Sequence, residues 1–293
     1  MSQVIDGKIA AANLNHITKT QVEHLKAFKN VQPGLAVVLV GSDPASHVYV
    51  RNKIHQAEAS GILSIEKRFD ATVSTEQLLS AIDQLNADPN VHGILVQLPL
   101  PSSIDAPKVI ARIAAEKDVD GFHVTNTGQL MSGEGRPLLP CTPQGCVILA
   151  KQYGGSDLSG KHAVVVGRSN IVGKPLAILL LQENCTVTIA HSRTADLPAI
   201  CRQADLLFVA VGRPEFVKAD WVKPGAMVID VGINRVDSPD GRSRLVGDVD
   251  YPATRGVASA ITPVPGGVGP MTIACLLKNT VEAACNQHGI PIP

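Results

Sequence analysis

The sequence predicts an α/β protein with two α/β domains. Three observations support this fold class. Strand-like and helix-like patterns alternate along the 293 residues, as in parallel sheets flanked by helices. The length is enough for two ordinary domains. One buried strand ends in a glycine turn at the start of a helix, a feature of dinucleotide-binding folds. We therefore expect the second domain to be Rossmann-like.

The first domain is predicted from three strand and helix pairs. Short apolar runs predict strands at 35–40, 64–69 and 93–98. Helical spacing of apolar residues, with capping and stop residues at the ends, predicts helices at 46–60, 75–86 and 104–115. Because strands and helices alternate here, we expect the three strands to be parallel.

Residues 125–143 differ in composition from the segments on either side. They are rich in Gly, Pro, Ser and Asn and have no sustained apolar period, so we interpret them as the connection between the domains. The first domain then covers 1–138 and the second 139–270. A final helix at 271–287 lies beyond the second set of strands, and we expect 271–293 to complete the first domain. Strands of the second domain are predicted at 162–166, 185–190, 206–211, 227–231 and 256–261.

Composition excludes several functional classes. Hydrophobic residues make up 45% and charged residues 18%, as in a globular enzyme with a substantial core. Basic and acidic residues balance at 26 each and aromatics are only 3%, so we expect no nucleic-acid partner. No apolar stretch approaches the roughly 20 residues that span a bilayer, and residues 1–12 do not resemble a signal peptide. We therefore expect no membrane partner.

Cysteine and histidine spacing gives two further expectations. None of the six cysteines forms a C-x-x-C pair, which favours a reducing, cytoplasmic location. The nine histidines are scattered and lack ligand spacing, so we predict no metal site.

The segment 164–175, with the sequence VVVGRSNIVGKP, is the most informative for a cofactor. Three valines predict a strand buried on both faces. The turn at Gly167, Arg168 and Ser169 then leads to a helix-like segment at 176–181. A turn of this kind places backbone N–H groups at the positive end of a helix, where a dinucleotide pyrophosphate binds. The spacing G-x-S-x-x-x-G departs from the usual G-x-G-x-x-G, so a turn that binds nothing stays an alternative.

The end of the next strand indicates which dinucleotide binds. The sequence there is His191-Ser192-Arg193-Thr194, without the Asp or Glu that usually holds the ribose of NAD. Ser192 offers a hydroxyl, and Arg193 and Arg168 offer guanidinium groups, which suit a 2′-phosphate. The pattern predicts NADP rather than NAD as the cofactor. The alternative is that Arg193 is only a solvated loop residue.

Polar residues of the first domain form a possible acid/base set. Tyr49 and Lys53 are four residues apart on a predicted helix and share one face; a phenol beside an amine is a familiar acid/base pair. Gln97 ends a buried strand, where ligands of α/β proteins bind. Asp118 and Asp120 flank a turn. Each also has a structural alternative: a surface lysine lying over an aromatic ring, a hydrogen-bonded strand end and an Asx-turn.

The loop 262–272, TPVPGGVGPMT, contains three prolines and three glycines. Prolines fix the backbone and glycines let it approach a ligand closely. This loop and the segments above together resemble the bifunctional methylenetetrahydrofolate dehydrogenase/methenyltetrahydrofolate cyclohydrolase family. The matching segments run in order over nearly the whole chain: 49–53, 96–101, 117–123, 140–145, 167–175, 230–234, 247–249 and 262–272.

The resemblance implies a cleft between the two domains, with a folate bound to the first and NADP to the second. It implies that Lys53 is the acid/base of the cyclohydrolase step, that Tyr49 contacts the substrate and that Gln97 contacts Lys53. Asp120 would hold the donor edge of the pterin. Further folate contacts are implied for the loop residues Pro265, Gly266 and Gly267. Contacts to NADP are implied for Gly167, Arg168, Ser169, Ser192 and Ile233.

The implied function is oxidation of 5,10-methylenetetrahydrofolate by NADP, followed by hydrolysis of 5,10-methenyltetrahydrofolate to 10-formyltetrahydrofolate. Relatives form homodimers through the dinucleotide domain, and we expect the same here. Val124 and Gln129 depart from the residues common in relatives, and both lie in the connecting segment. The alternatives are a dehydrogenase without cyclohydrolase activity, a non-catalytic NADP-sensing protein, and an amino-acid or shikimate-type dehydrogenase of the same two-domain plan.

Overall fold

The computed structural model describes residues 2–237 and 243–293, and the chain divides into two compact units. Unit 1 consists of Met1–Ala12 and Thr142–Thr272. Unit 2 consists of Asn13–Cys141 and Ile273–Pro293. Each unit has a parallel sheet of its own, as the predicted fold class requires. The predicted cleft stays a prediction.

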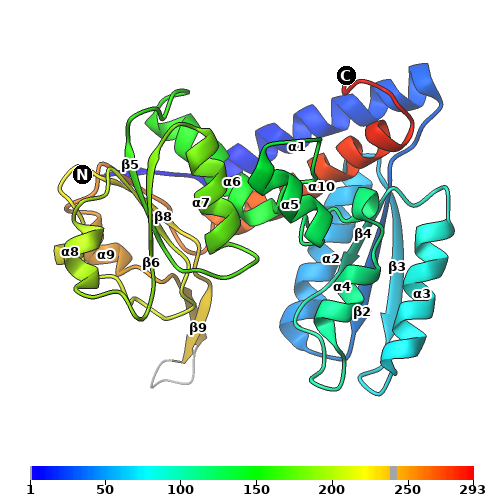
Figure 1. Cartoon of the computed structure of the whole chain (residues 1–293), viewed down its shortest axis with the longest axis horizontal. Coiled ribbons are helices and arrows are strands. Elements are labelled where there is room, and N and C mark those ends of the chain that lie inside the picture. Colours follow the sequence, from blue (N-terminus) through cyan, green and yellow to red (C-terminus); the bar gives the residue numbers. More distant parts are fainter. Residues whose placement is uncertain (1, 238–242) are drawn as a thin grey trace. The chain divides into compact units, whose positions relative to one another are not determined.

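Unit 2 contains a three-stranded parallel sheet in the order β3-β2-β4. Its strands are β2 (Gly34–Val40), β3 (Leu63–Phe69) and β4 (Gly93–Val96). Helices α2 (Pro44–Ala59) and α3 (Thr75–Ala87) lie on opposite sides of this sheet in Figure 1. Every residue of β2 and β4 is buried, which explains their continuous apolar sequences.

Local capping signals set where these helices begin. The Asp43 side chain accepts a hydrogen bond from the Ser46 N–H at 2.8 Å, and Pro44 occupies the first turn. Helix α2 therefore starts two residues before the predicted position, because Pro is well suited to the first helical position. Ser74 and Gln77 form a reciprocal capping box at the start of α3.

Unit 1 contains a six-stranded sheet in the order β1-β11-β8-β7-β5-β6, in which every pair of neighbours is parallel. Its strands are β1 (Gln3–Val4), β5 (His162–Val166), β6 (Thr186–Ala190), β7 (Leu206–Val209), β8 (Met227–Asp230) and β11 (Ala260–Ile261). Helix α7 (Gly173–Gln182) connects β5 to β6. Strands β9 (Asn234–Asp237) and β10 (Ser243–Val246) form a separate antiparallel pair. The predicted Rossmann-like sheet is thus present.

The boundary between the units falls within 125–143, between Cys141 and Thr142, but the segment is not irregular throughout. Helix α5 (Val124–Ser132) covers 125–132, and α6 (Cys141–Gly154) begins before the segment ends. The His123 ring accepts a hydrogen bond from the Thr125 N–H at 3.1 Å and caps α5. Only two residues of α5, Asn126 and Leu130, are buried, so its apolar period is too short to detect in the sequence.

The N-terminal residues also differ from expectation. Strand β1 pairs in parallel with β11, so Met1–Ala12 belong to unit 1 rather than to the first predicted domain. Helix α1 (Gly7–His24) then continues into unit 2. The remaining helices are η1 (Leu25–Lys29), α4 (Ala106–Arg112), η2 (Ala115–Lys117), α8 (Leu197–Cys201), η3 (Ala219–Trp221), α9 (Tyr251–Thr254) and α10 (Val268–Gln287). No helix in the described part of the chain is long and apolar enough to cross a membrane.

Candidate active site and cofactor site

Lys53 and Gln97 form the centre of the site in unit 2. Helix α2 carries Lys53, whose side chain is largely buried, with only 9% of the residue surface exposed. Its Nζ donates a hydrogen bond to Gln97 Oε1 at 2.9 Å. Gln97 directly follows β4, and its own N–H donates to Val38 O on the neighbouring strand. The carboxyl end of a parallel sheet therefore holds the acceptor for a buried amine, where open α/β sheets bind ligands.

Gln97 is itself fixed on its other side. Its Nε2 donates to the Leu98 carbonyl at 2.6 Å, so the amide oxygen faces Lys53. An amide oxygen accepts a hydrogen bond from an ammonium or from a neutral amine. Gln97 can thus hold the Lys53 side chain while a proton is gained or lost. Tyr49 lies one turn earlier on α2 and is 39% exposed, which leaves its ring accessible to a ligand.

Asp120 is the acidic group near Lys53. Burial raises the pKa of Asp120 to about 6; the Lys53 charge acts in the opposite direction and the Asp118 charge in the same direction. Asp118 is fully buried and accepts hydrogen bonds from the His123 N–H at 2.6 Å and from Asn126 Nδ2 at 3.2 Å. Asp118 therefore has the structural role that the Asx-turn alternative predicted. Asp120 is half-buried, and its carboxyl group is near enough to Lys53 for the lysine charge to affect its pKa.

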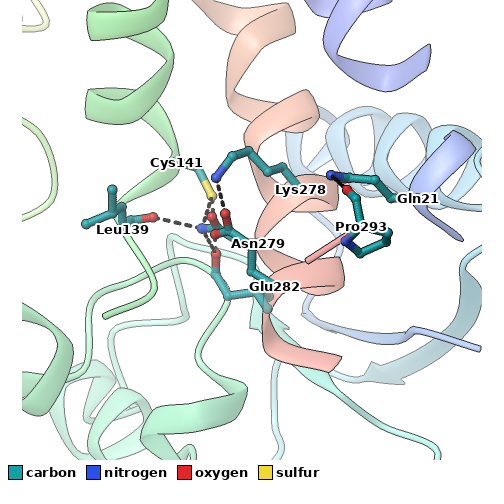
Figure 2. A network of polar contacts seen from close by, with 8 residues as sticks. Gln21, Leu139, Cys141, Lys278, Asn279, Glu282 and Pro293 are labelled. Carbon is teal, nitrogen blue, oxygen red and sulfur yellow. Dashed lines mark hydrogen bonds and ion pairs between the residues drawn. The ribbon is translucent and has the colours of Figure 1, made fainter. Parts of the chain in front are cut away.

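A buried amide holds the turn that carries Asp120. Asn279 on α10 donates through Nδ2 to the carbonyl of Val119 at 2.8 Å and to the carbonyl of Leu139, also at 2.8 Å (Figure 2). The same nitrogen lies 3.6 Å from Cys141 Sγ. Sequence reasoning missed Asn279, because a lone asparagine within an apolar helix carries no motif.

Unit 1 provides the predicted dinucleotide turn. A side chain at Gly167 would place its Cβ 2.2 Å from the Ala210 carbonyl, and one at Gly173 would lie 2.2 Å from the Gly167 carbonyl. Both positions therefore require glycine for the backbone to turn so tightly into α7. Ser169 Oγ accepts hydrogen bonds from the N–H groups of Val172 and Gly173 at 3.1 and 3.3 Å. The hydroxyl of Ser169 thus organises the start of the helix.

A cavity of about 230 Å³ opens beside this turn. Three of the predicted cofactor residues, Gly167, Arg168 and Ser192, line it. Among the other lining residues, two with polar side chains were not among the predicted cofactor residues: Arg213, whose guanidinium lies 4.3 Å from the centre of the Phe216 ring, and His191. The lining residues include two arginines and no carboxylate. This donor set fits a cofactor that carries a 2′-phosphate.

The other predicted cofactor and loop residues lie elsewhere in unit 1. Arg193 is exposed and next to Ser192, but it does not line the cavity. Ile233 is 43% exposed and lies close to Gly269, near the start of α10. The loop Pro265–Gly267 approaches the start of α1, where the Gly7 N–H donates to Gly266 O at 3.0 Å. The glycines of this loop thus also serve backbone packing.

Comparison with known proteins decides the family. A family model described as "Tetrahydrofolate dehydrogenase/cyclohydrolase, catalytic domain" matches residues 5–120. The corresponding NAD(P)-binding domain model matches residues 140–288. The chain belongs to the tetrahydrofolate dehydrogenase/cyclohydrolase family. The predicted resemblance is confirmed, and with it the prediction that the chain is an enzyme with a dinucleotide-binding domain.

Individual members of the family match over the full length. "Bifunctional protein FolD" from Rhodopseudomonas palustris (strain HaA2) is 60% identical over 291 residues, which cover 99% of this chain and 98% of that protein. The crystal structure of the bifunctional enzyme from Campylobacter jejuni is 46% identical, with a TM-score of 0.93 and coverage of 98% and 100%. A Trypanosoma brucei member, crystallised with NADP cofactor and an inhibitor, is 39% identical, with a TM-score of 0.92 and 98% coverage of both chains.

Within the described ranges 2–237 and 243–293, no group of three or more His, Cys, Asp or Glu side chains could hold a metal ion.

Proposed function

We propose that this chain oxidises 5,10-methylenetetrahydrofolate with NADP and hydrolyses 5,10-methenyltetrahydrofolate to 10-formyltetrahydrofolate, with Lys53 as the acid/base of hydrolysis. One observation carries the proposal: Lys53 is a buried amine, held by Gln97 and close enough to Asp120 for their charges to interact. Acid/base side chains act best when they are positioned within reach of the proton that they transfer.

The residues of unit 2 fit two parts of the folate chemistry: binding of the pterin ring and hydrolysis of the methenyl group. The Asp120 carboxylate accepts N–H bonds from the pterin, which orients the ring. Tyr49 packs against the substrate from the exposed side of α2. During hydrolysis a water molecule attacks the cationic methenyl carbon and loses a proton to Lys53 Nζ. The proton returns to N5 as the bond between that carbon and N5 breaks, which leaves the formyl group on N10.

The residues of unit 1 would hold the cofactor. NADP, when bound, supplies the acceptor for the hydride that leaves the methylene carbon. The turn at Gly167–Ser169 offers backbone N–H groups to the phosphates. Arg168, Ser192 and Arg213 provide donors for the 2′-phosphate at the cavity. In this proposal Ile233 and Pro265–Gly267 contact the nicotinamide and folate, and Arg193 adds positive charge near the phosphate.

Replacement of Lys53 by methionine tests the proposal. Met keeps much of the apolar volume and removes the amine, so K53M should lower the rate of methenyltetrahydrofolate hydrolysis by at least a hundredfold. NADP binding should stay unchanged. Hydrolysis is measured as the decay of substrate absorbance, with the uncatalysed decay subtracted.

Lys67→Met is the matched control, because Lys67 is an exposed lysine of the same unit. It should hydrolyse the substrate at the unaltered rate. If K53M folds and hydrolyses as fast as K67M, Lys53 is not the acid/base. If the unaltered protein reduces NADP but does not hydrolyse the methenyl compound, it is a monofunctional dehydrogenase.

We also propose a cytoplasmic homodimer that forms through unit 1. Strand β6 lies at the edge of the sheet, where its free backbone groups are available for pairing. Ile189 on β6 and Leu181 on α7 are 43% and 59% exposed. Light scattering should give twice the chain mass, and Ile189→Lys should give a monomer. None of the six cysteines takes part in a disulfide, which supports a reducing compartment.

A further inference from the structure

The short segment after β7 forms one wall of the cavity in unit 1. Val211 and Arg213 line the cavity, and Gly212 lies between them with a φ of 65°. A segment outside any helix or strand does not satisfy its own N–H groups, so other groups must hold it in place. The side chain that does this comes from a distant part of the sequence.

That side chain is Asp248, whose residue surface is 0% exposed. Its Oδ2 accepts hydrogen bonds from the N–H groups of Val211 at 2.6 Å and Gly212 at 2.9 Å. Its Oδ1 accepts from the Arg213 N–H at 2.8 Å and from Asn234 Nδ2 at 2.8 Å. A carboxylate offers about four acceptor positions, and these four donors use them. Three successive backbone groups of the cavity wall are thus bound to one buried carboxylate.

A second buried carboxylate holds the first. Asp230, at the end of β8, accepts hydrogen bonds from the N–H groups of Asp248 and Val249, both at 2.9 Å. A Cβ at Gly247 would lie 1.8 Å from Asp230 Oδ2, so the residue before Asp248 must be glycine. Asp230, which ends strand β8, therefore fixes the position of the Asp248 backbone.

We propose that Asp248 is a positioning residue for the cofactor: it holds residues 211–213 so that Arg213 faces the cavity. The inference rests on the proposed NADP site. The Phe216 ring supports the Arg213 guanidinium, and the bond from the Arg213 N–H to Asp248 positions the main chain from which that side chain extends. Asp248 does not line the cavity itself, so it acts on the cofactor through this segment.

Asp248→Asn is the direct test. One amide N–H₂ replaces a carboxylate oxygen and faces backbone N–H donors, so residues 211–213 lose at least one bond. We expect the KM for NADP in methylenetetrahydrofolate oxidation to rise at least tenfold, with kcat within threefold of the unaltered enzyme. The preference for NADP over NAD should narrow by a similar factor. Hydrolysis of methenyltetrahydrofolate, which consumes no NADP, should keep its rate.

Asp205→Asn is the matched control. Asp205 lies in the same unit and accepts a backbone hydrogen bond from the His162 N–H at 2.9 Å, but it is not at the cavity. The KM of D205N for NADP should stay within twofold of that of the unaltered enzyme. Asn234→Ala is the second variant, in case D248N does not fold. It removes one of the four donors to Asp248 and should raise the KM for NADP about threefold.

Three outcomes overturn the inference. The first is a folded D248N with an unchanged KM for NADP. The second is a D248N that loses hydrolysis and oxidation to the same degree, and the third, if D248N is unfolded, is an unchanged KM for NADP in N234A. Arg213→Ala separates this failure from that of the proposed site. If R213A raises the KM for NADP while D248N does not, only the role of Asp248 is wrong; if neither does, the proposed site is wrong.

Discussion

At the scale of single residues, Asp120 predicts how folate binding responds to pH. Burial raises the pKa of this carboxyl to about 6, against about 3.9 for an ordinary Asp. Only the ionised form accepts two pterin N–H groups. We therefore expect kcat/KM for methylenetetrahydrofolate, measured in the oxidation reaction, to fall as the pH drops through about 6. By pH 5 the loss should be about tenfold.

The variant Asp120→Asn should have a low kcat/KM that does not change between pH 5 and 7.5.

Asp120 should also make the stability of the folded protein depend on pH, with stability falling as the pH rises. The folded protein binds the Asp120 proton more tightly than the unfolded chain, so ionisation of Asp120 destabilises the fold as pH rises from about 4 to 6. D120N should thus gain stability relative to the unaltered protein at pH 7.5, and not at pH 4. Asp70→Asn, an exposed control, should show the same pH dependence as the unaltered protein. If kcat/KM of D120N still falls below pH 6, Asp120 is not the group that controls folate binding.

The residues of the site differ in how far the sequence could reveal them. Lys53 and Gln97 stand in segments with a recognisable pattern, so their chemistry could be proposed before their hydrogen bond was seen. Asp248 and Asn279 could not be found this way. Each is a polar residue that binds backbone groups far away in the sequence, and no local spacing records such a contact.

At the scale of elements, the helical conformation of α5 leads to a prediction about stability. Gly128 lies within α5, and a Cβ there meets nothing within 4 Å. Gly128→Ala should therefore raise the free energy of unfolding by about 0.5–1 kcal/mol, because glycine is the poorer helix former. The measurement is urea denaturation followed by circular dichroism.

Gly133 is the matched control, since it ends the same helix with a φ of 74°. Alanine is strained in that conformation, so Gly133→Ala should lower stability where Gly128→Ala raises it. Equal destabilisation by both substitutions would mean that 124–132 is not helical in solution.

Deep burial made some elements easy to predict, although β3 was also predicted with no residue fully buried. Strands β2 and β4 are buried along their whole length, so their sequences are continuously apolar and easy to recognise. Helix α5 buries only two residues, and its capping group is a histidine. Strand β1 has two residues, too few for any period. Their positions depend on tertiary contacts that the local sequence does not encode.

At the scale of the whole molecule, each unit is discontinuous in sequence. Met1–Ala12 join Thr142–Thr272 through the pairing of β1 with β11. Ile273–Pro293 join unit 2, where Asn279 binds the carbonyls of Val119 and Leu139. The return of 271–293 to the first domain was expected because that helix follows the last predicted strand, whereas nothing in the composition of 1–12 marks them as part of the second domain.

The division into units leads to a prediction about ligand-linked stability. A ligand that binds only the folded state stabilises it by about 2.7 kcal/mol at 100 times its Kd. We expect NADP at that concentration to raise the thermal unfolding midpoint of the chain by several degrees, and NAD at the same concentration to raise it much less. Differential scanning calorimetry measures both shifts.

Two variants serve as controls for this shift in the unfolding midpoint. Because Lys53 lies in unit 2 and the cavity in unit 1, K53M should show the full NADP shift. Arg168→Ala should lose most of the difference between NADP and NAD. Equal shifts with both cofactors in the unaltered protein would mean that the arginines at the cavity do not select the 2′-phosphate.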